Sequence, residues 1–145
     1  HSTVELVLAG SCVYDSALRS LVSELDLENS VKFLGFVSEK DKSTLYANSL
    51  ALVFPSLYEG FGLPILEAQS VNTAVITSSC GVMQETAGSG AVFIDPENEA
   101  TLVEALSQLA VDQSFRSELV KRGQDNLVRF TWDKAANQLK ELLLR

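Results

Sequence analysis

The chain lacks most of the features that would assign a metal or a compartment. It has two cysteines in 145 residues, with no CxxC or Cys/His spacing, so no disulfide framework or zinc site is expected. No run of about 18 apolar residues is present, and no cationic and apolar segment opens the chain. We therefore expect neither a membrane span nor a signal peptide, and we predict a reduced, cytoplasmic protein that holds no metal.

Positive charge is also scarce. The sequence has 11 Lys and Arg against 19 Asp and Glu, a net charge of −8, and no basic stripe. Because binding to nucleic-acid phosphates needs clustered Lys or Arg, we expect no nucleic-acid partner. The hydrophobic content of 46% excludes a disordered chain, and the length suits one domain over residues 1–145.

Short apolar runs alternate with amphipathic segments along the chain. We expect strands at residues 4–9, 31–34, 50–54, 74–77 and 91–94, with helical periodicity between them. Three amphipathic stretches follow without a strand between them, and we expect Trp132, which heads the last, to pack in the core or against another domain. Apolar strands that alternate with helices indicate a parallel sheet covered on both faces. The predicted fold is α/β, a Rossmann-like doubly wound parallel sheet with a helical C-terminal tail.

Local signals predict where two of the helices begin or end. Ser38 followed by Asp41 resembles a capping box at a helix start. Pro64 is placed to be the first residue of a helix reaching about Val71, because its fixed φ suits that position. Asn72 tolerates the left-handed conformation, so we expect it to end the same helix.

The loop after the third expected strand differs from the others, and residues 55–68 read PSLYEGFGLPILEA. Gly60 and Gly62 lack a Cβ, so the backbone can turn sharply there and approach a ligand closely. The helix start that follows offers free N–H groups and a dipole, which form an anion site without lysine. Glu59 before the loop and Glu67, expected in the first helical turn, can accept hydrogen bonds from paired hydroxyls. An anion site with a hydroxyl-binding carboxylate on each side fits a sugar–diphosphate–ribose compound. In the alternative interpretation, the glycines only turn the chain and the helix dipole alone stabilises Glu67.

The stretch from Glu59 to Glu67 resembles the E-x7-E motif of retaining, nucleotide-sugar-dependent glycosyltransferases of the GT-B fold, family four, also called glycosyl transferases group 1. Residues 34–38, 45–47, 53–56, 84–85 and 95–96 fall in the order and spacing of that family's C-terminal, donor-binding domain. The resemblance covers nearly the whole chain. It implies one half of a GT-B enzyme of the hexosyltransferase type, acting in polysaccharide or glycan biosynthesis.

The resemblance also implies roles for single residues. Glu59 would bind hydroxyls of the transferred sugar nearest the reacting centre, as the catalytic candidate, and Glu67 would bind the ribose diol. Contacts to the sugar and diphosphate would come from Gly60, Phe61, Gly62 and Leu63, and contacts to the base from Gly35, Phe36 and Val37. Glu85 is a further candidate that ranks below Glu59 and Glu67. The donor would be a UDP-, GDP- or ADP-linked sugar, with no cofactor and no metal, in agreement with the absence of a DxD motif.

Two parts of the family pattern are missing from the sequence. The family's donor domain usually begins with a further strand and a Gly-Arg…Lys segment, and an N-terminal acceptor domain precedes it. We therefore expect a fragment that does not transfer sugar by itself, whose partner is the missing N-terminal domain. Any peripheral membrane contact would be made through that half. Part of the apolar stripe on the last helix would then be unpaired.

Two other functions fit parts of the sequence. A non-catalytic module that binds a nucleotide or a sugar phosphate would keep Glu59 and Glu67 on the same scaffold. A flavodoxin-like signalling domain would show the same alternation of strands and helices. The second is disfavoured, because Gly10, Ser11 and Cys12 follow the first expected strand in place of an acidic cluster.

Overall fold

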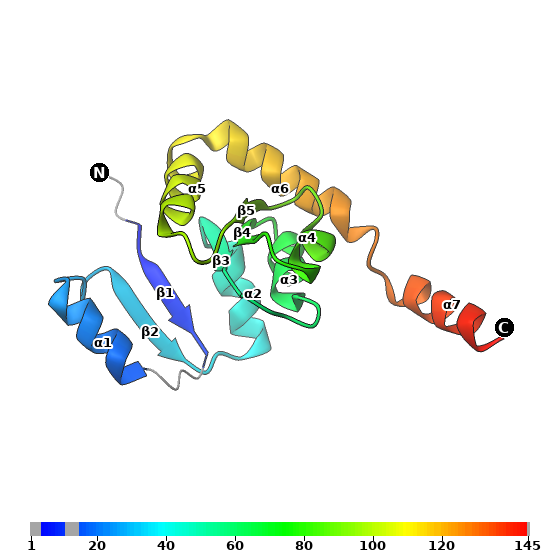
Figure 1. Ribbon diagram of the computed structural model, residues 1–145, viewed down its shortest axis with the longest axis horizontal. Helices are drawn as coiled ribbons and strands as arrows, with labels where there is room; N and C mark the ends of the chain where they lie inside the picture. Colours follow the sequence, from blue (N-terminus) through cyan, green and yellow to red (C-terminus); the bar gives the residue numbers. More distant parts are fainter. Residues whose placement is uncertain (1–3, 11–14, 145) are drawn as a thin grey trace. The chain divides into compact units, whose positions relative to one another are not determined.

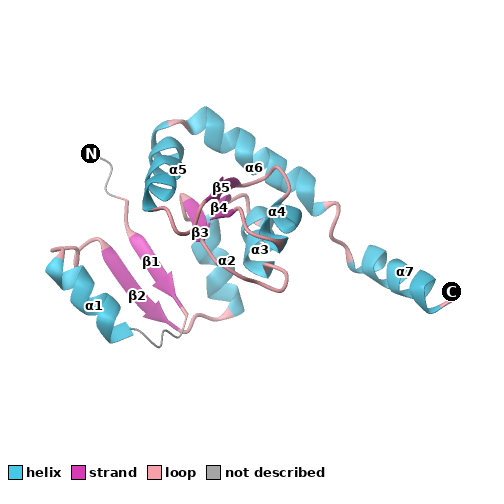
Figure 2. Ribbon diagram, in the orientation of Figure 1, coloured by secondary structure: helices cyan, strands magenta, loops and turns pink. Residues whose placement is uncertain are grey.

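A computed structural model of the protein describes residues 4–10 and 15–144. The chain divides into two compact units, His1–Lys42 and Ser43–Arg145. The described strands pair within their own unit, two in the first and three in the second, and all pairs are parallel. Figure 1 labels the elements along the sequence, and Figure 2 separates helices from strands by colour.

The first unit is built on two parallel strands, β1 (Leu6–Ala9) and β2 (Val31–Gly35), joined through helix α1 (Asp15–Glu24). The guanidinium of Arg19 on α1 lies 4.2 Å from the ring centroid of Phe33 on β2. Of the three residues that follow the first expected strand, Ser11 and Cys12 lie outside the described residues.

Helix α2 (Glu39–Ala47) begins after the capping residue that the sequence predicts. The backbone N–H of Asp41 donates to Ser38 Oγ at 3.2 Å, and the Ser38 hydroxyl donates to the Asp41 carboxylate at 2.7 Å. The helix start is therefore confirmed. The second bond joins two side chains, whereas a capping box returns the carboxylate to the backbone.

The second unit contains β3 (Ala51–Phe54), β4 (Ala74–Ser78) and β5 (Val92–Ile94), in that spatial order. Helix α3 (Leu63–Ser70) connects β3 to β4, and α4 (Val82–Ala87) connects β4 to β5. The sheet is followed by α5 (Glu99–Val111), α6 (Gln113–Leu127) and α7 (Trp132–Leu143), the three helices that the sequence predicts.

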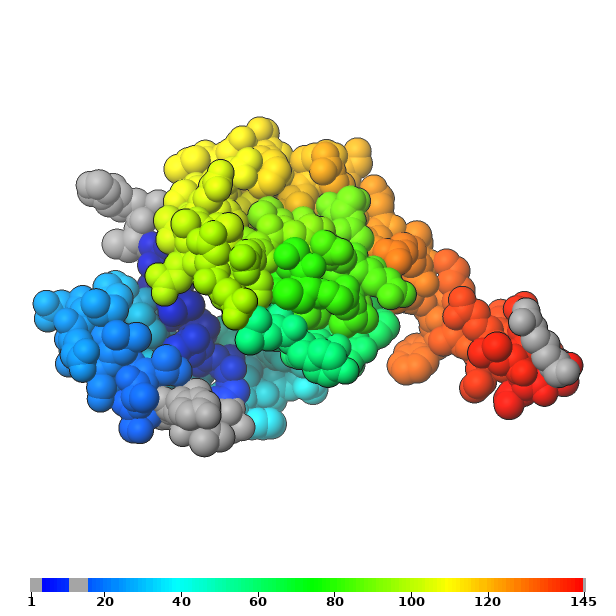
Figure 3. Space-filling view, viewed as in Figure 1, coloured from blue at the N-terminus to red at the C-terminus, as the bar shows by residue number. Residues whose placement is uncertain are grey.

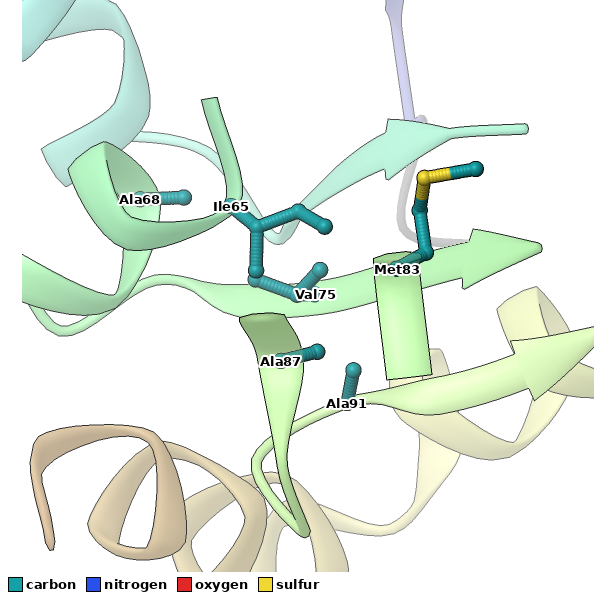
Figure 4. Close-up of a cluster of buried hydrophobic side chains, with 6 residues drawn as sticks. All are labelled: Ile65, Ala68, Val75, Met83, Ala87 and Ala91. Atoms are coloured by element: carbon teal, nitrogen blue, oxygen red, sulfur yellow. The ribbon is translucent and has the colours of Figure 1, made fainter. Parts of the chain in front are cut away.

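The core of the second unit forms on both faces of β4, all of whose residues are buried. Because side chains alternate along a strand, Val75 points to one face and its neighbours Ala74 and Ile76 to the other. Val75 packs with residues of α3 and α4 and with Ala91 (Figure 4). Ala74 and Ile76 pack with residues of β5, α5 and α6. The predicted α/β fold, with helices on both faces of a parallel sheet, is confirmed.

Helix α3 begins at Leu63, one residue before Pro64, and ends at Ser70. Asn72 follows with a φ of 63°, the left-handed conformation that the sequence predicts. The N–H of Thr73 donates to the carbonyl of Ala68 at 3.0 Å, and the N–H of Asn72 donates to that of Gln69 at 3.2 Å. These two bonds are those of a Schellman motif, which satisfies the last carbonyls of a helix.

The prediction for Trp132 is wrong in one of its two readings, because the side chain is 91% exposed and does not pack in the core. No residue of α7 is buried, and Figure 3 shows the side chains of this segment, coloured red, at the surface. The large apolar residues that this helix exposes are Trp132, Leu139, Leu142 and Leu143, and the expectation that a further domain would cover part of this stripe stays a prediction. In the described ranges, no helix is long and apolar enough to cross a membrane.

Candidate functional site

Two buried hydroxyl groups hold the start of the loop between β3 and α3. Thr77 Oγ1 donates to the carbonyl of Phe54 at 2.8 Å, and Ser78 Oγ donates to the carbonyl of Ser56 at 2.5 Å. Both donors are fully buried at the carboxyl end of β4. The loop therefore leaves the sheet at the edge where parallel α/β folds bind their ligands. Sequence reasoning missed both residues; the available signal was a polar pair at the end of an otherwise apolar strand.

Gly62 forms the turn into α3, and its conformation favours glycine. It is the N-cap residue with φ 88° and ψ 44°, in the left-handed region that L side chains rarely adopt. An added Cβ would lie 3.2 Å from Ile65 Cδ1. Gly60 differs, because its φ lies outside that region and nothing lies within 4 Å of an added Cβ. The chain bends at Gly60 as well, but of these two glycines Gly62 is the one whose conformation favours glycine.

Glu59 is a partly buried carboxylate within this loop. The hydroxyl of Ser56, three residues earlier, donates to Glu59 Oε1 at 3.0 Å. This hydrogen bond restrains the carboxylate from within its own loop through Oε1, and a carboxylate can accept further hydrogen bonds. The geometry suits a carboxylate that accepts hydrogen bonds from a polyhydroxylated ligand.

Glu67 lies in the second turn of α3, so the prediction that placed it in the first turn is wrong. The helix begins at Leu63, and Glu67 is its fifth residue, beyond the N–H groups that carry most of the positive end of the dipole. The hydroxyl of Tyr46 on α2 donates to Glu67 Oε2 at 3.4 Å. The alternative explanation of Glu67, stabilisation by the dipole alone, loses its basis.

The N-terminus of α3 lacks a capping side chain. Gly62 provides none, and Pro64 occupies one of the first positions, where its missing N–H removes one donor that would need a partner. The remaining backbone N–H groups and the dipole favour an anion at this end of the helix. Leu63 and Glu67 stand four residues apart, away from the face that α3 buries through Ile65, Ala68 and Gln69.

Three residues that sequence reasoning missed contact the loop directly or through a neighbour. Thr86 Oγ1, on α4, donates to the carbonyl of Phe61 at 2.5 Å. The ring of Phe61 packs edge-on against that of Phe130, with centroids 5.8 Å apart. Arg129 lies over Phe130 and donates to the carbonyl of Glu85 at 3.1 Å. The available signal for Thr86 was a hydroxyl between Met83 and Ala87 on a buried helix face.

The remaining predicted site residues lie on α4 and at the end of β2. Glu85 is exposed on α4. Gly35 ends β2 with a φ of 65°, and Phe36 after it is 88% exposed. Gly35, Phe36 and Val37 belong to the first unit and the glutamates to the second, so the structure does not join the two sets. Within the ranges that the structure describes, no group of three or more His, Cys, Asp or Glu could hold a metal ion.

A parallel α/β domain with an anion-binding helix start after a strand is typical of nucleotide-binding proteins. Residues 1–126 match the family Glycosyl transferases group 1, and the chain belongs to this family. It is 34% identical over 124 residues to the O-antigen chain mannosyltransferase B of Escherichia coli, covering 86% of this chain and 32% of that protein. The chain thus spans about a third of the length of the curated relatives it matches.

Solved structures agree with this assignment. Alr3699/HepE of Anabaena, in complex with UDP-glucose, superposes with a TM-score of 0.88 at 25% identity, over 99% of this chain and 41% of that one. The C-terminal domain of a glycosyl transferase group 1 family protein of Francisella tularensis superposes with a TM-score of 0.72 at 25% identity, over 80% of this chain and 61% of that one. The predicted resemblance to a GT-B C-terminal domain is confirmed.

Proposed function

We propose that this chain is the donor-binding half of a retaining glycosyltransferase that moves a sugar from a nucleotide-diphosphate sugar to an acceptor. The observation that carries the proposal is the uncapped start of α3, with a restrained carboxylate on either side of it. The complex of Alr3699/HepE with UDP-glucose supports this ligand class.

Each part of the donor has a matching chemistry in the site. The backbone N–H groups between Gly60 and Leu63, with the α3 dipole, bind the diphosphate. Glu59 accepts hydrogen bonds from hydroxyls of the transferred sugar, next to the bond that breaks. Glu67, beside the Tyr46 hydroxyl, accepts hydrogen bonds from the ribose diol.

The remaining contacts of the donor stay proposals of the same kind. Main-chain groups of Gly35 and Val37, with Phe36 beside them, contact the base. Glu85 contributes near the sugar and the phosphates. The other half of the GT-B fold binds the acceptor, and we propose that the reaction takes place in the cytoplasm.

Backbone dipoles explain how a chain with a net charge of −8 can bind a diphosphate. The N–H groups at a helix start place local positive potential where the leaving group develops charge, whatever the net charge of the surface. We propose that transfer needs no bound metal for this reason. Retention of activity in EDTA, with sugar transfer measured in the full polypeptide that carries this chain, is the expected result.

Calorimetric titration tests the assignment of the two glutamates. The titrants are UDP, GDP and ADP and their sugar conjugates, and the protein is the full polypeptide that carries this chain. Glu67→Ala should weaken every ribose nucleotide that binds, whereas Glu59→Ala should weaken only the sugar-loaded form. Hydrogen bonds to a charged group contribute about 1.5–3 kcal/mol, which corresponds to about 10- to 150-fold in the dissociation constant.

Glu104→Ala is the matched control, because this glutamate is exposed on α5, which packs on the opposite face of the sheet from α3. It should leave all affinities unchanged. Equal binding of the sugar-loaded donor by Glu59→Ala and the parent protein would remove the role of Glu59. Donor binding without sugar transfer to any acceptor would favour the non-catalytic module instead.

A further inference from the structure

A hydrogen bond from Thr86 to the Phe61 carbonyl connects α4 to the loop. Thr86 is 1% exposed, and its Oγ1 lies 2.5 Å from the carbonyl oxygen of Phe61. Phe61 stands between the two glycines of the loop, where the backbone has the least steric restriction. The bond therefore restrains a segment that its own sequence leaves free to rotate.

Peptide geometry carries this restraint to the next residue. A trans peptide is planar, so the carbonyl of Phe61 and the N–H of Gly62 point in opposite directions from the same bond. Thr86 draws the carbonyl toward α4, and the N–H of Gly62 consequently points away from α4. In the part of the chain that the structure describes, no protein group accepts a hydrogen bond from this N–H.

We propose that Thr86 is a positioning residue, which orients the Phe61–Gly62 peptide so that the Gly62 N–H donates to the donor diphosphate. This inference rests on the proposed function, because it needs the diphosphate at the start of α3. Thr86 touches no part of the donor itself and acts through the peptide bond. The Thr86 hydroxyl replaces a water molecule that would otherwise donate to the Phe61 carbonyl. Because the hydroxyl is fixed in the fold, it also fixes the direction of the peptide, which a mobile water molecule does not.

The end of α4 is itself held, so Thr86 does not simply follow the loop. Asn126 Nδ2, on α6, donates to the carbonyl of Thr86 at 2.8 Å and to Gln69 Oε1 at 2.9 Å. Arg129 Nη1 donates to the carbonyl of Glu85 at 3.1 Å. The last turn of α4 is thus anchored to α6 and, through Asn126, to α3, the helix whose N-terminus the loop forms.

Two substitutions separate the hydroxyl of Thr86 from its methyl group. A Cβ added at Gly62 would lie 3.9 Å from Thr86 Cγ2, so the methyl group lies on the side of the turn. Thr86→Val keeps the shape and the methyl group but removes the donor. Thr86→Ser keeps the donor and removes the methyl group. Thr101→Val is the control, because Thr101 Oγ1 also donates to backbone carbonyls, at the start of α5.

The test measures binding and loop conformation in the full polypeptide that carries this chain. By calorimetry, Thr86→Val should weaken UDP, GDP or ADP, whichever the parent binds, by about tenfold, the effect of losing one hydrogen bond. Thr86→Ser and Thr101→Val should stay within about twofold of the parent. By NMR, the Gly62 amide should give one sharp signal in the parent and in Thr86→Ser, and a broadened or doubled signal in Thr86→Val, as the peptide exchanges between orientations.

Each unfavourable outcome has a distinct meaning. Equal affinity and an unchanged Gly62 signal in Thr86→Val would overturn the positioning role, as would weaker binding by Thr86→Ser than by Thr86→Val. A parent protein that binds none of the three diphosphates would instead overturn the proposed function, while the Gly62 signal still reports on Thr86. Thr86→Ala, which also lacks the hydroxyl, replaces the valine variant if that variant does not fold.

Discussion

Replacing Gly62 with alanine tests whether the turn into α3 depends on glycine. Gly62 has a φ of 88°, and a Cβ there would lie 3.2 Å from Ile65 Cδ1. Gly60, two residues earlier in the same loop, has a φ outside the left-handed region and open space around an added Cβ. The pair therefore compares one strained position with one unstrained position in a single loop.

The magnitude follows from the difference between the two variants. An alanine in place of glycine restricts the unfolded chain, which adds about 0.4–1 kcal/mol to stability where the native backbone accepts it. This contribution cancels between Gly62→Ala and Gly60→Ala. The left-handed conformation costs an L residue about 1–2 kcal/mol, and the contact with Ile65 adds to this cost, because that side chain is fully buried in the core. Gly62→Ala should thus be less stable than Gly60→Ala by about 1–2 kcal/mol or more.

Urea unfolding followed by far-ultraviolet circular dichroism measures this difference. Fluorescence is a poor choice, because the single tryptophan, Trp132, is 91% exposed in the folded protein. Gly60→Ala should unfold at or above the urea concentration of the parent protein, and Gly62→Ala below it, with equal slopes. Equal free energies of unfolding for the two variants would show that the left-handed conformation at Gly62 does not constrain this loop.

Two further predictions concern α6. Asn126→Ala should lower the free energy of unfolding by about 2–4 kcal/mol, because it leaves the buried carbonyl of Thr86 and Gln69 Oε1 without their donor; a loss below about 1 kcal/mol in urea unfolding would contradict this. Asp112 caps α6. The hydrogen bond from the Ser114 hydroxyl, and to a smaller extent the one from the Phe115 N–H, lowers the pKa of its carboxyl group below the ordinary value of 3.8. Its charged form therefore stabilises the fold above that pH, so Asp112→Ala should lower the thermal midpoint at neutral pH, by an amount that shrinks as the pH falls below 3.8. A difference that does not depend on pH would exclude the cap as its cause.

The order of elements could be predicted from the sequence because its signals are local. Apolar runs of strand length, helical periodicity and turn residues each depend on a few neighbouring positions. The strands and helices of the structure lie close to the positions that these signals predict. Asn72 is a good example, since its tolerance of a positive φ is a property of the residue itself. Glu59 and Glu67 could be proposed as site residues for the same reason, because they belong to one contiguous motif.

The sequence was less informative wherever the partner of a residue is distant along the chain. Gly60 and Gly62 look alike in the sequence, and the folded structure distinguishes them by the φ of 88° at Gly62 and by its close contact with Ile65. Gly90 is a stronger case: a Cβ there would lie 2.5 Å from the Cα of Gly123, so α6 closely approaches the turn before β5. The residues next to either glycine in the sequence do not predict that contact.

Local patterns in this chain determined its α/β class, its helix ends and the acidic, glycine-containing motif, because propensity, capping and periodicity depend on near neighbours. The tertiary structure decided which groups hold that motif in place. Thr77 donates to a carbonyl at the end of β3, and Ser78 and Thr86 donate to carbonyls of the loop after it, over 22 to 25 residues. Tyr46 donates to Glu67 across 21 residues. Such pairs form only when the folded chain brings distant segments within hydrogen-bond distance, and no spacing in the sequence encodes them.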